Sequence, residues 1–164
     1  MALAQPSATL ARRGAAMCYE AILLLAISFI VSYGLLAVLD WSHPLAPGQR
    51  LALQASLLSA FGVYFVYCWS RSGQTLAMKS WHLKVVDAQG QPPSPRRALV
   101  RYLAGWTLFA PALLWLAILP AGTWSTVIIG VTSVVVMSLF GRLDPERRLL
   151  HDRIAGTRLV LVRT

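Results

Sequence analysis

Glu20 is the acidic residue whose position in the sequence most suggests chemistry, because the run that follows it, Ala21–Leu39, contains no charge. A charged group inside a membrane span costs roughly 2.5 to 3.5 kcal/mol at the centre and less near the edge, so Glu20 requires a partner. Arg13 precedes it by seven residues, almost two helical turns, which places both side chains on one helical face. The favoured interpretation is a structural ion pair between them. The alternative is a carboxylate that titrates on an ion path.

A second pair of residues that could bind a metal ion or form strong hydrogen bonds, His151 and Asp152, lies in the polar C-terminal tail. Adjacent residues on a helix point about 100° apart, so the pair cannot chelate one metal ion alone. His43 and His82 lie far away in the sequence, and His43 is expected on the opposite side of the membrane. No metal site and no cofactor is therefore predicted. We expect His151 or Asp152 to order the tail, for instance by hydrogen bonds to the cytoplasmic end of a span or to the arginine pairs of the central polar segment.

The remaining motifs concern backbone geometry rather than catalysis. Gly73 and Gln74 begin a GQT turn, and Thr75 is predicted to cap a short helix over TLAMKSWH. Gly156 and Thr157 precede a strand candidate at Arg158–Val162. The sequence contains no nucleotide-binding glycine loop, nucleophile elbow or zinc spacing, so no catalytic residue is assigned and an enzyme is not expected.

The composition indicates which environment these residues occupy. Hydrophobic residues make up 57% of the chain and charged residues 13%, whereas roughly a quarter of a soluble domain is charged. A membrane protein is therefore predicted. The net charge of +9 does not indicate a nucleic-acid partner, because the basic residues lie in short segments that flank apolar runs. Anionic lipid headgroups are the expected partner.

Long apolar runs predict a single domain over residues 12–164, an all-α membrane protein built as a four-helix transmembrane bundle. Each span has roughly the length that crosses a bilayer. The third and fourth come from one long uncharged run that Pro120 and Gly122 divide. The predicted spans cover residues 15–39, 51–69, 99–119 and 125–140.

Two polar segments complete the predicted domain, a cytoplasmic loop at 71–98 and a cytoplasmic tail at 142–164. Short interfacial helices are expected there, together with a small two-stranded β element. Leu83–Asp87 and Arg158–Val162 have strand character, and pairing them satisfies both edges. Fourteen of the fifteen basic residues fall on the side of both termini, which predicts that both termini are cytoplasmic.

Three sequence blocks resemble the RDD family of small bacterial membrane proteins. They are RRGAAMCYEAILL at 12–24, RSGQTLAMKSWHLKVVDAQGQPPSPRRALVRYL at 71–103 and HDRIAGTRLV at 151–160. The family is named for an arginine and two aspartates, which by motif fall on Arg13, Glu20 and Asp152. Glu20 departs from the pattern by one methylene group. The resemblance implies a multi-pass protein of the bacterial inner membrane.

The resemblance also implies a function, because some family members are linked to transport of unidentified ligands and some to sodium and proton exchange. Transport of an ion or small ligand is therefore expected. The alternative is a non-catalytic scaffold or accessory protein that binds a partner through its loop and tail. Four spans with one intramembrane carboxylate do not readily enclose a pathway, so a homo-oligomer or a membrane-protein partner is expected.

Overall fold

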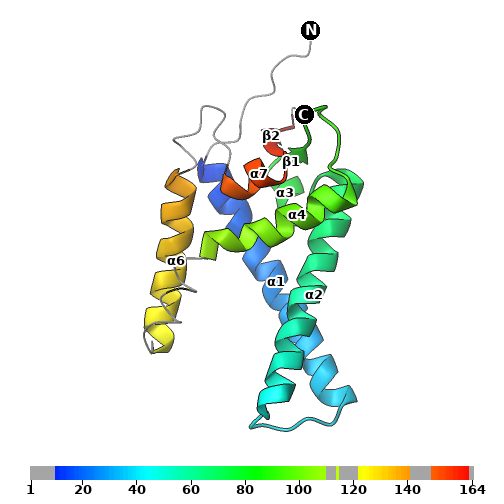
Figure 1. The fold of residues 1–164 in the computed structure, drawn as a ribbon, viewed down its shortest axis with the longest axis vertical. Coiled ribbons are helices and arrows are strands. Elements are labelled where there is room, and N and C mark those ends of the chain that lie inside the picture. The colour runs from blue at the N-terminus through cyan, green and yellow to red at the C-terminus, as the bar shows by residue number, and fades with distance from the viewer. Residues whose placement is uncertain (1–9, 110–113, 115–121, 141–148, 163–164) are drawn as a thin grey trace.

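The computed structural model describes residues 10–109, 114, 122–140 and 149–162 of the chain. Over this part the protein is mainly helical, and two long helices, α1 (Leu10–Val38) and α2 (Pro47–Ser72), cross each other along its length (Figure 1). The short elements gather near one end of this pair. We call that end, which carries α3, β1, β2 and α7, the sheet end.

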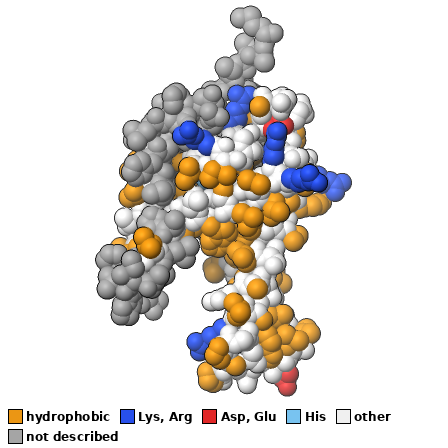
Figure 2. All heavy atoms as spheres, in the orientation of Figure 1, with side chains coloured by type: hydrophobic (Ala, Val, Ile, Leu, Met, Phe, Trp, Pro, Cys, Tyr) orange, Lys and Arg blue, Asp and Glu red, His pale blue; other side chains and the backbone are white. Residues whose placement is uncertain are grey.

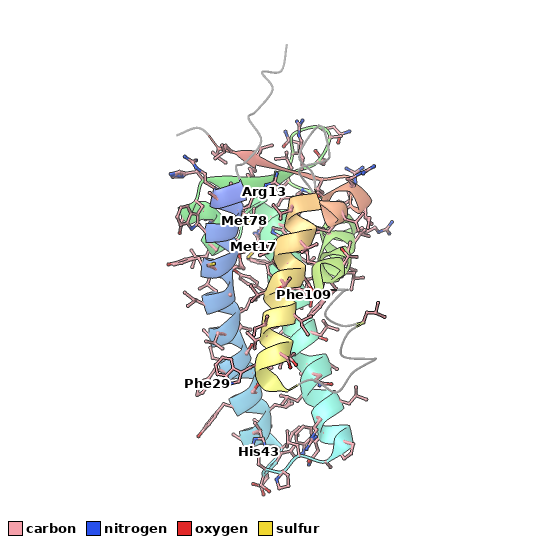
Figure 3. The ribbon with its side chains drawn as sticks, turned by 90° about the vertical axis from the view of Figure 1, so that its left-hand side faces the viewer. Arg13, Met17, Phe29, His43, Met78 and Phe109 are labelled. Carbon is pink, nitrogen blue, oxygen red and sulfur yellow. The ribbon has the colours of Figure 1, made fainter. Side chains whose placement is uncertain are left out.

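Helices α1 and α2 match the first two predicted spans. Both are long and apolar enough to cross a membrane by length and composition, and few residues of their apolar stretches are fully buried by the rest of the chain. A helix of 26 residues such as α2 extends about 39 Å, which exceeds the roughly 30 Å of a bilayer's hydrocarbon core. His43, in the connection between the two helices, lies at the opposite end of the molecule from Arg13 (Figure 3).

The second half of the predicted bundle differs from the structure. Helix α6 (Thr123–Phe140) corresponds to the fourth predicted span and stands in the same direction as α1 and α2. The span predicted at 99–119 is wrong over its described first half. That part belongs to α4 (Pro95–Gly105), which lies crosswise to α1 and α2 and continues into a 3₁₀ turn, η1 (Trp106–Phe109). Residues 110–113 and 115–119 of that span lie outside the described residues, so a four-helix bundle is not confirmed.

The start of α4 at Pro95 has a local physical cause. Ser94 caps the helix by accepting a hydrogen bond from the backbone N–H of Arg97 (3.4 Å), and Pro95 occupies the first helical position. The helix therefore begins in the polar loop, before the apolar run starts. Arg101 lies within it and is buried, which requires polar partners that a lipid-facing span would not supply.

The predicted strand pairing is confirmed. β1 (Leu83–Val86) and β2 (Arg158–Leu161) are antiparallel, with Leu83 opposite Leu161 and Val86 opposite Arg158. The short helix α3 (Leu76–Ser80) precedes β1, and Thr75 caps it by accepting from the N–H of Met78 (3.2 Å), as predicted.

The hydrophobic core of the sheet end joins α1, the α3–β1 segment and β2, which are far apart in the sequence. Ala16 of α1, Met78 of α3, and Leu83 and Val85 of β1 are buried together. Trp69, Leu159 and Leu161 pack around them. The core therefore fixes the start of α1 against the loop and the tail.

Gly73 makes the sharp junction between α2 and this core possible. It ends α2 in the left-handed conformation (φ 75°), and its carbonyl accepts the N–H of Val85 (2.8 Å). The side-chain Nε2 of Gln74 donates to the carbonyl of Leu83 (2.6 Å). The GQT motif therefore ties the end of α2 to β1.

Candidate functional site

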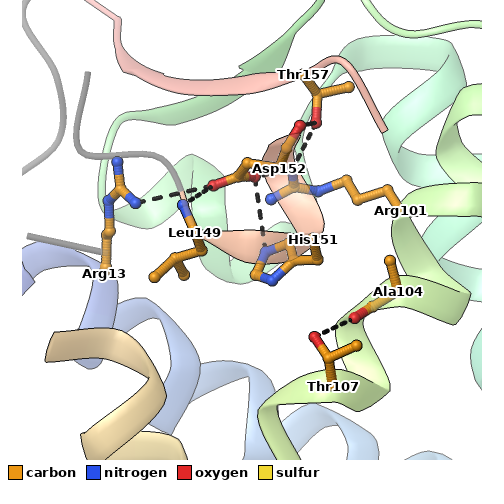
Figure 4. A network of polar contacts seen from close by, with 8 residues as sticks. All are labelled: Arg13, Arg101, Ala104, Thr107, Leu149, His151, Asp152 and Thr157. Carbon is orange, nitrogen blue, oxygen red and sulfur yellow. Dashed lines mark hydrogen bonds and ion pairs between the residues drawn. The ribbon is translucent and has the colours of Figure 1, made fainter. Parts of the chain in front are cut away.

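A buried cluster of charges lies where α1, α4 and the tail meet (Figure 4). Asp152, on the short helix α7 (Leu150–Ile154), is only 1% exposed. Arg101 of α4 donates from one nitrogen, Nη1, both to Asp152 Oδ1 and to Thr157 Oγ1, the latter at 2.8 Å. Nη1 of Arg13 lies 3.9 Å from Asp152 Oδ2, which also accepts the N–H of Leu149 at 3.2 Å. One carboxylate thus joins three distant segments of the chain.

The backbone of the tail holds Asp152 and Thr157 in place. Gly156 has φ 62°, a conformation that favours glycine and turns the chain back after α7. The N–H of Thr157 then donates to the carbonyl of Asp152 (2.9 Å). On the other side of the cluster, the guanidinium of Arg101 lies 4.9 Å from the ring centroid of Trp69, which adds a cation–π contact from α2. The expectation that Asp152 orders the tail through hydrogen bonds is therefore correct, but its partner is Arg101 of α4 and not the arginine pair of the loop.

The charges decide the protonation states in this cluster. Burial alone would raise the pKa of Asp152, but Arg101, His151 and Arg13 outweigh it, so the pKa lies below its usual value and Asp152 is ionised at neutral pH. Burial, followed by the nearby charge of Arg101, lowers the pKa of His151 to about 4. His151 is thus neutral at pH 7, and its Nε2 lies 3.6 Å from Asp152 Oδ1, beyond hydrogen-bond distance.

The buried neutral His151 predicts a loss of stability in mild acid. Between pH 6.5 and pH 4 the unfolded chain binds a proton at this residue that the folded chain does not, so stabilisation present above pH 6.5 disappears as the pH falls. The slope is at most about 1.4 kcal/mol per pH unit. Chemical unfolding in detergent across this range should show it, and His151→Asn should flatten the curve. The matched control His82→Asn changes an exposed histidine, and an equal flattening in that variant would contradict the assignment.

Glu20 occupies a separate site that links α1, α2 and α3. Its Oε1 accepts from the hydroxyl of Tyr64 (2.7 Å), and its Oε2 accepts from Oγ1 of Thr75 (2.5 Å), a side chain with no exposed surface. The expected ion pair with Arg13 is wrong, because Arg13 contacts Asp152 and Glu20 contacts two neutral hydroxyls. Seven residues of helix separate the two by about 10 Å along the axis, which allows each to reach a different neighbour.

The structure thus divides the sequence-predicted residues between two places. Arg13, His151, Asp152 and Thr157 meet in the buried cluster, with Gly156 shaping the turn beside it. Glu20 and Thr75 meet in the second site, next to the junction that Gly73 and Gln74 make.

Sequence reasoning missed Arg101, Tyr64 and Trp69. Arg101 leaves a signal, because on a helix it lies on the face opposite Leu99 and Leu103. Tyr64 leaves a weaker one, a hydroxyl inside an apolar run.

The two sites offer different chemistry. Among the described residues, no group of three histidine, cysteine or acidic side chains could hold a metal ion. The buried cluster is suited to fastening the tail onto α1 and α4. The Glu20 site instead brings together a carboxylate of α1 and the hydroxyls of Tyr64 of α2 and Thr75 at the cap of α3, a set of oxygen atoms of the kind that contacts a cation.

The comparisons with known proteins identify one family. The model of the RDD family matches residues 7–156, which confirms the resemblance of the sequence blocks. The curated proteins gave no match, and neither did the solved structures.

Proposed function

Because the chain belongs to the RDD family, we propose that it is an integral protein of the bacterial inner membrane that transports an ion or small ligand. The observation that supports this most is Glu20, a carboxylate within one of the two candidate spans, held by hydroxyls from α2 and from the cap of α3. Its partners in the structure are two neutral hydroxyls, and among the described residues no cation is paired with it. The ion pair that would have made Glu20 purely structural is not formed.

The distribution of charge supports an orientation with the sheet end in the cytoplasm. On the face that Figure 2 shows, most basic side chains lie toward that end, and a smaller group lies at the opposite end. Fourteen of the fifteen basic residues belong to the N-terminal segment, to residues 71–101 and to the tail, and Arg50 is the exception. Both termini are then cytoplasmic. A pathway past Glu20 needs walls beyond α1, α2 and α3, which a second copy or another membrane protein would supply.

Removing the charge of Glu20 tests the proposal. In liposomes with a pH-sensitive dye and a sodium, potassium or proton gradient, Glu20→Gln should reduce flux at least tenfold while abundance stays unchanged. Glu20→Asp, which resembles the family's usual residue, should retain flux. Asp40→Asn is a matched control. This carboxylate follows the far end of α1, so its removal should leave the flux unchanged.

Two other outcomes point elsewhere. Unchanged flux in Glu20→Gln would remove Glu20 from the pathway. No flux in the folded parent protein under any gradient would favour the scaffold, a protein that binds its partner through the sheet end.

A further inference from the structure

Helix α4 has its polar and apolar faces reversed relative to a helix on a soluble protein. The side turned to the protein carries Ala98, Arg101 and Tyr102, all buried, so it includes a charge. The outer side carries apolar residues at helical spacing that remain substantially exposed, with Leu103 at 55%. A soluble surface helix places its charges outside and its apolar stripe inside. The exposed apolar residues on the outer side of α4 are Leu99, Val100, Leu103 and, just beyond the helix, Trp106.

Helix α7 repeats the reversal and packs against α4. Its inward residues are His151 and Asp152, whereas Leu150 and Ile154, one turn apart, are each 53% exposed. Figure 2 shows hydrophobic side chains gathered in a row at the level of α4, with basic side chains above the row and at one end of it. The two helices thus share an apolar outer face over a charged interior.

The position of α4 along α2 places this face within one leaflet. The hydroxyl of Tyr102 donates to the carbonyl of Leu58 (2.8 Å), and its ring lies against Gly62, where an added Cβ would come within 3.1 Å of it. Gly62 precedes the end of α2 at Ser72 by ten residues, which corresponds to about 15 Å of helix. Half of a bilayer's hydrocarbon core is also about 15 Å. The contact therefore lies below the membrane surface if α2 spans the bilayer.

We propose that α4 and α7 form a platform embedded in the leaflet at the sheet end, with their shared face among acyl chains and Arg96 bound to the phosphate of an anionic phospholipid. Arg96 begins the same face of α4, one turn before Leu99 and Val100. Neighbouring Arg97 is paired with Asp87 (3.5 Å), whereas Arg96 is exposed and has no partner among the described residues. Depth and charge together favour a lipid over a protein at this face. The inference rests on the membrane location in the proposed function.

Spin labels at single cysteines test the depth of the platform. On a Cys18→Ala, Cys68→Ala background in vesicles, labels at Leu103→Cys and Ile154→Cys should collide more with oxygen than with a water-soluble nickel complex. Phe29→Cys, in the middle of α1, is the lipid reference, and Gln89→Cys, in the polar loop, is the water reference. The platform alone is overturned if the Phe29 label collides mainly with oxygen while the Leu103 label collides mainly with the nickel complex. It is also overturned if the Leu103 label then collides with neither agent. If the labels at Leu103 and Phe29 both collide mainly with the nickel complex, the membrane location itself is overturned.

Spin-labelled lipids test the headgroup site. The association of labelled phosphatidylglycerol relative to labelled phosphatidylcholine should fall about fivefold in Arg96→Gln. Arg158→Gln, which removes an exposed charge from β2, should leave the ratio unchanged. No change in Arg96→Gln, or an equal fall in both variants, would overturn a specific site at Arg96.

Discussion

Asp152→Asn should lower the free energy of unfolding by about 3 to 5 kcal/mol, the range found when one partner of a buried ion pair is removed. The carboxylate is 1% exposed and is the acceptor for Arg101, with Arg13 nearby at 3.9 Å. Asparagine keeps the size and an oxygen for the N–H of Leu149, so the change isolates the charge. Thermal or chemical unfolding in detergent micelles measures the effect.

Two further variants make this expectation specific. Asp87→Asn breaks the exposed pair with Arg97 and should cost less than about 1 kcal/mol. Adding Arg101→Met to Asp152→Asn should recover part of the loss, because the orphaned charge is removed while packing against Trp69 is retained. If Asp152→Asn and Asp87→Asn cost the same, the buried cluster does not stabilise the fold.

Gly73→Ala should cost at least about 3 kcal/mol. A left-handed φ of 75° is unfavourable for alanine by about 1 to 2 kcal/mol, and the new Cβ would lie 2.6 Å from the backbone oxygen of Val85. That oxygen belongs to β1, so the strand would have to move away from the end of α2. Unfolding in the same micelles measures this loss in the free energy of unfolding.

Gly90→Ala is the matched control for this variant. Gly90 has φ 80°, and an added Cβ there meets nothing within 4 Å. It should therefore show only the conformational cost, about 1 to 2 kcal/mol. Equal losses at both glycines would mean that the approach of β1 to Gly73 is not required.

Local chemistry explains what could be predicted from the sequence. Thr75 can cap α3 and the β-branched pair at Val85 favours a strand, because both depend on neighbours in the chain. The two isolated strand segments could be paired, since each had no other candidate. The partner of Glu20 could not be predicted, because helical spacing places Arg13 on the same face without showing which neighbouring element faces each residue. The crosswise course of α4 was hidden for a similar reason, since hydropathy merges its apolar face with the run that follows.

The order of the segments along the chain has a consequence for synthesis. Both α7 and β2 come after every other described element, yet they supply the carboxylate for Arg101 and the pairing edge for β1. Until they emerge, Arg101 lacks its carboxylate partner and β1 has an open edge. A chain that is interrupted before Leu149 would lack both of these partners permanently. The contacts at the sheet end can therefore be completed only after α7 and β2 have been synthesised.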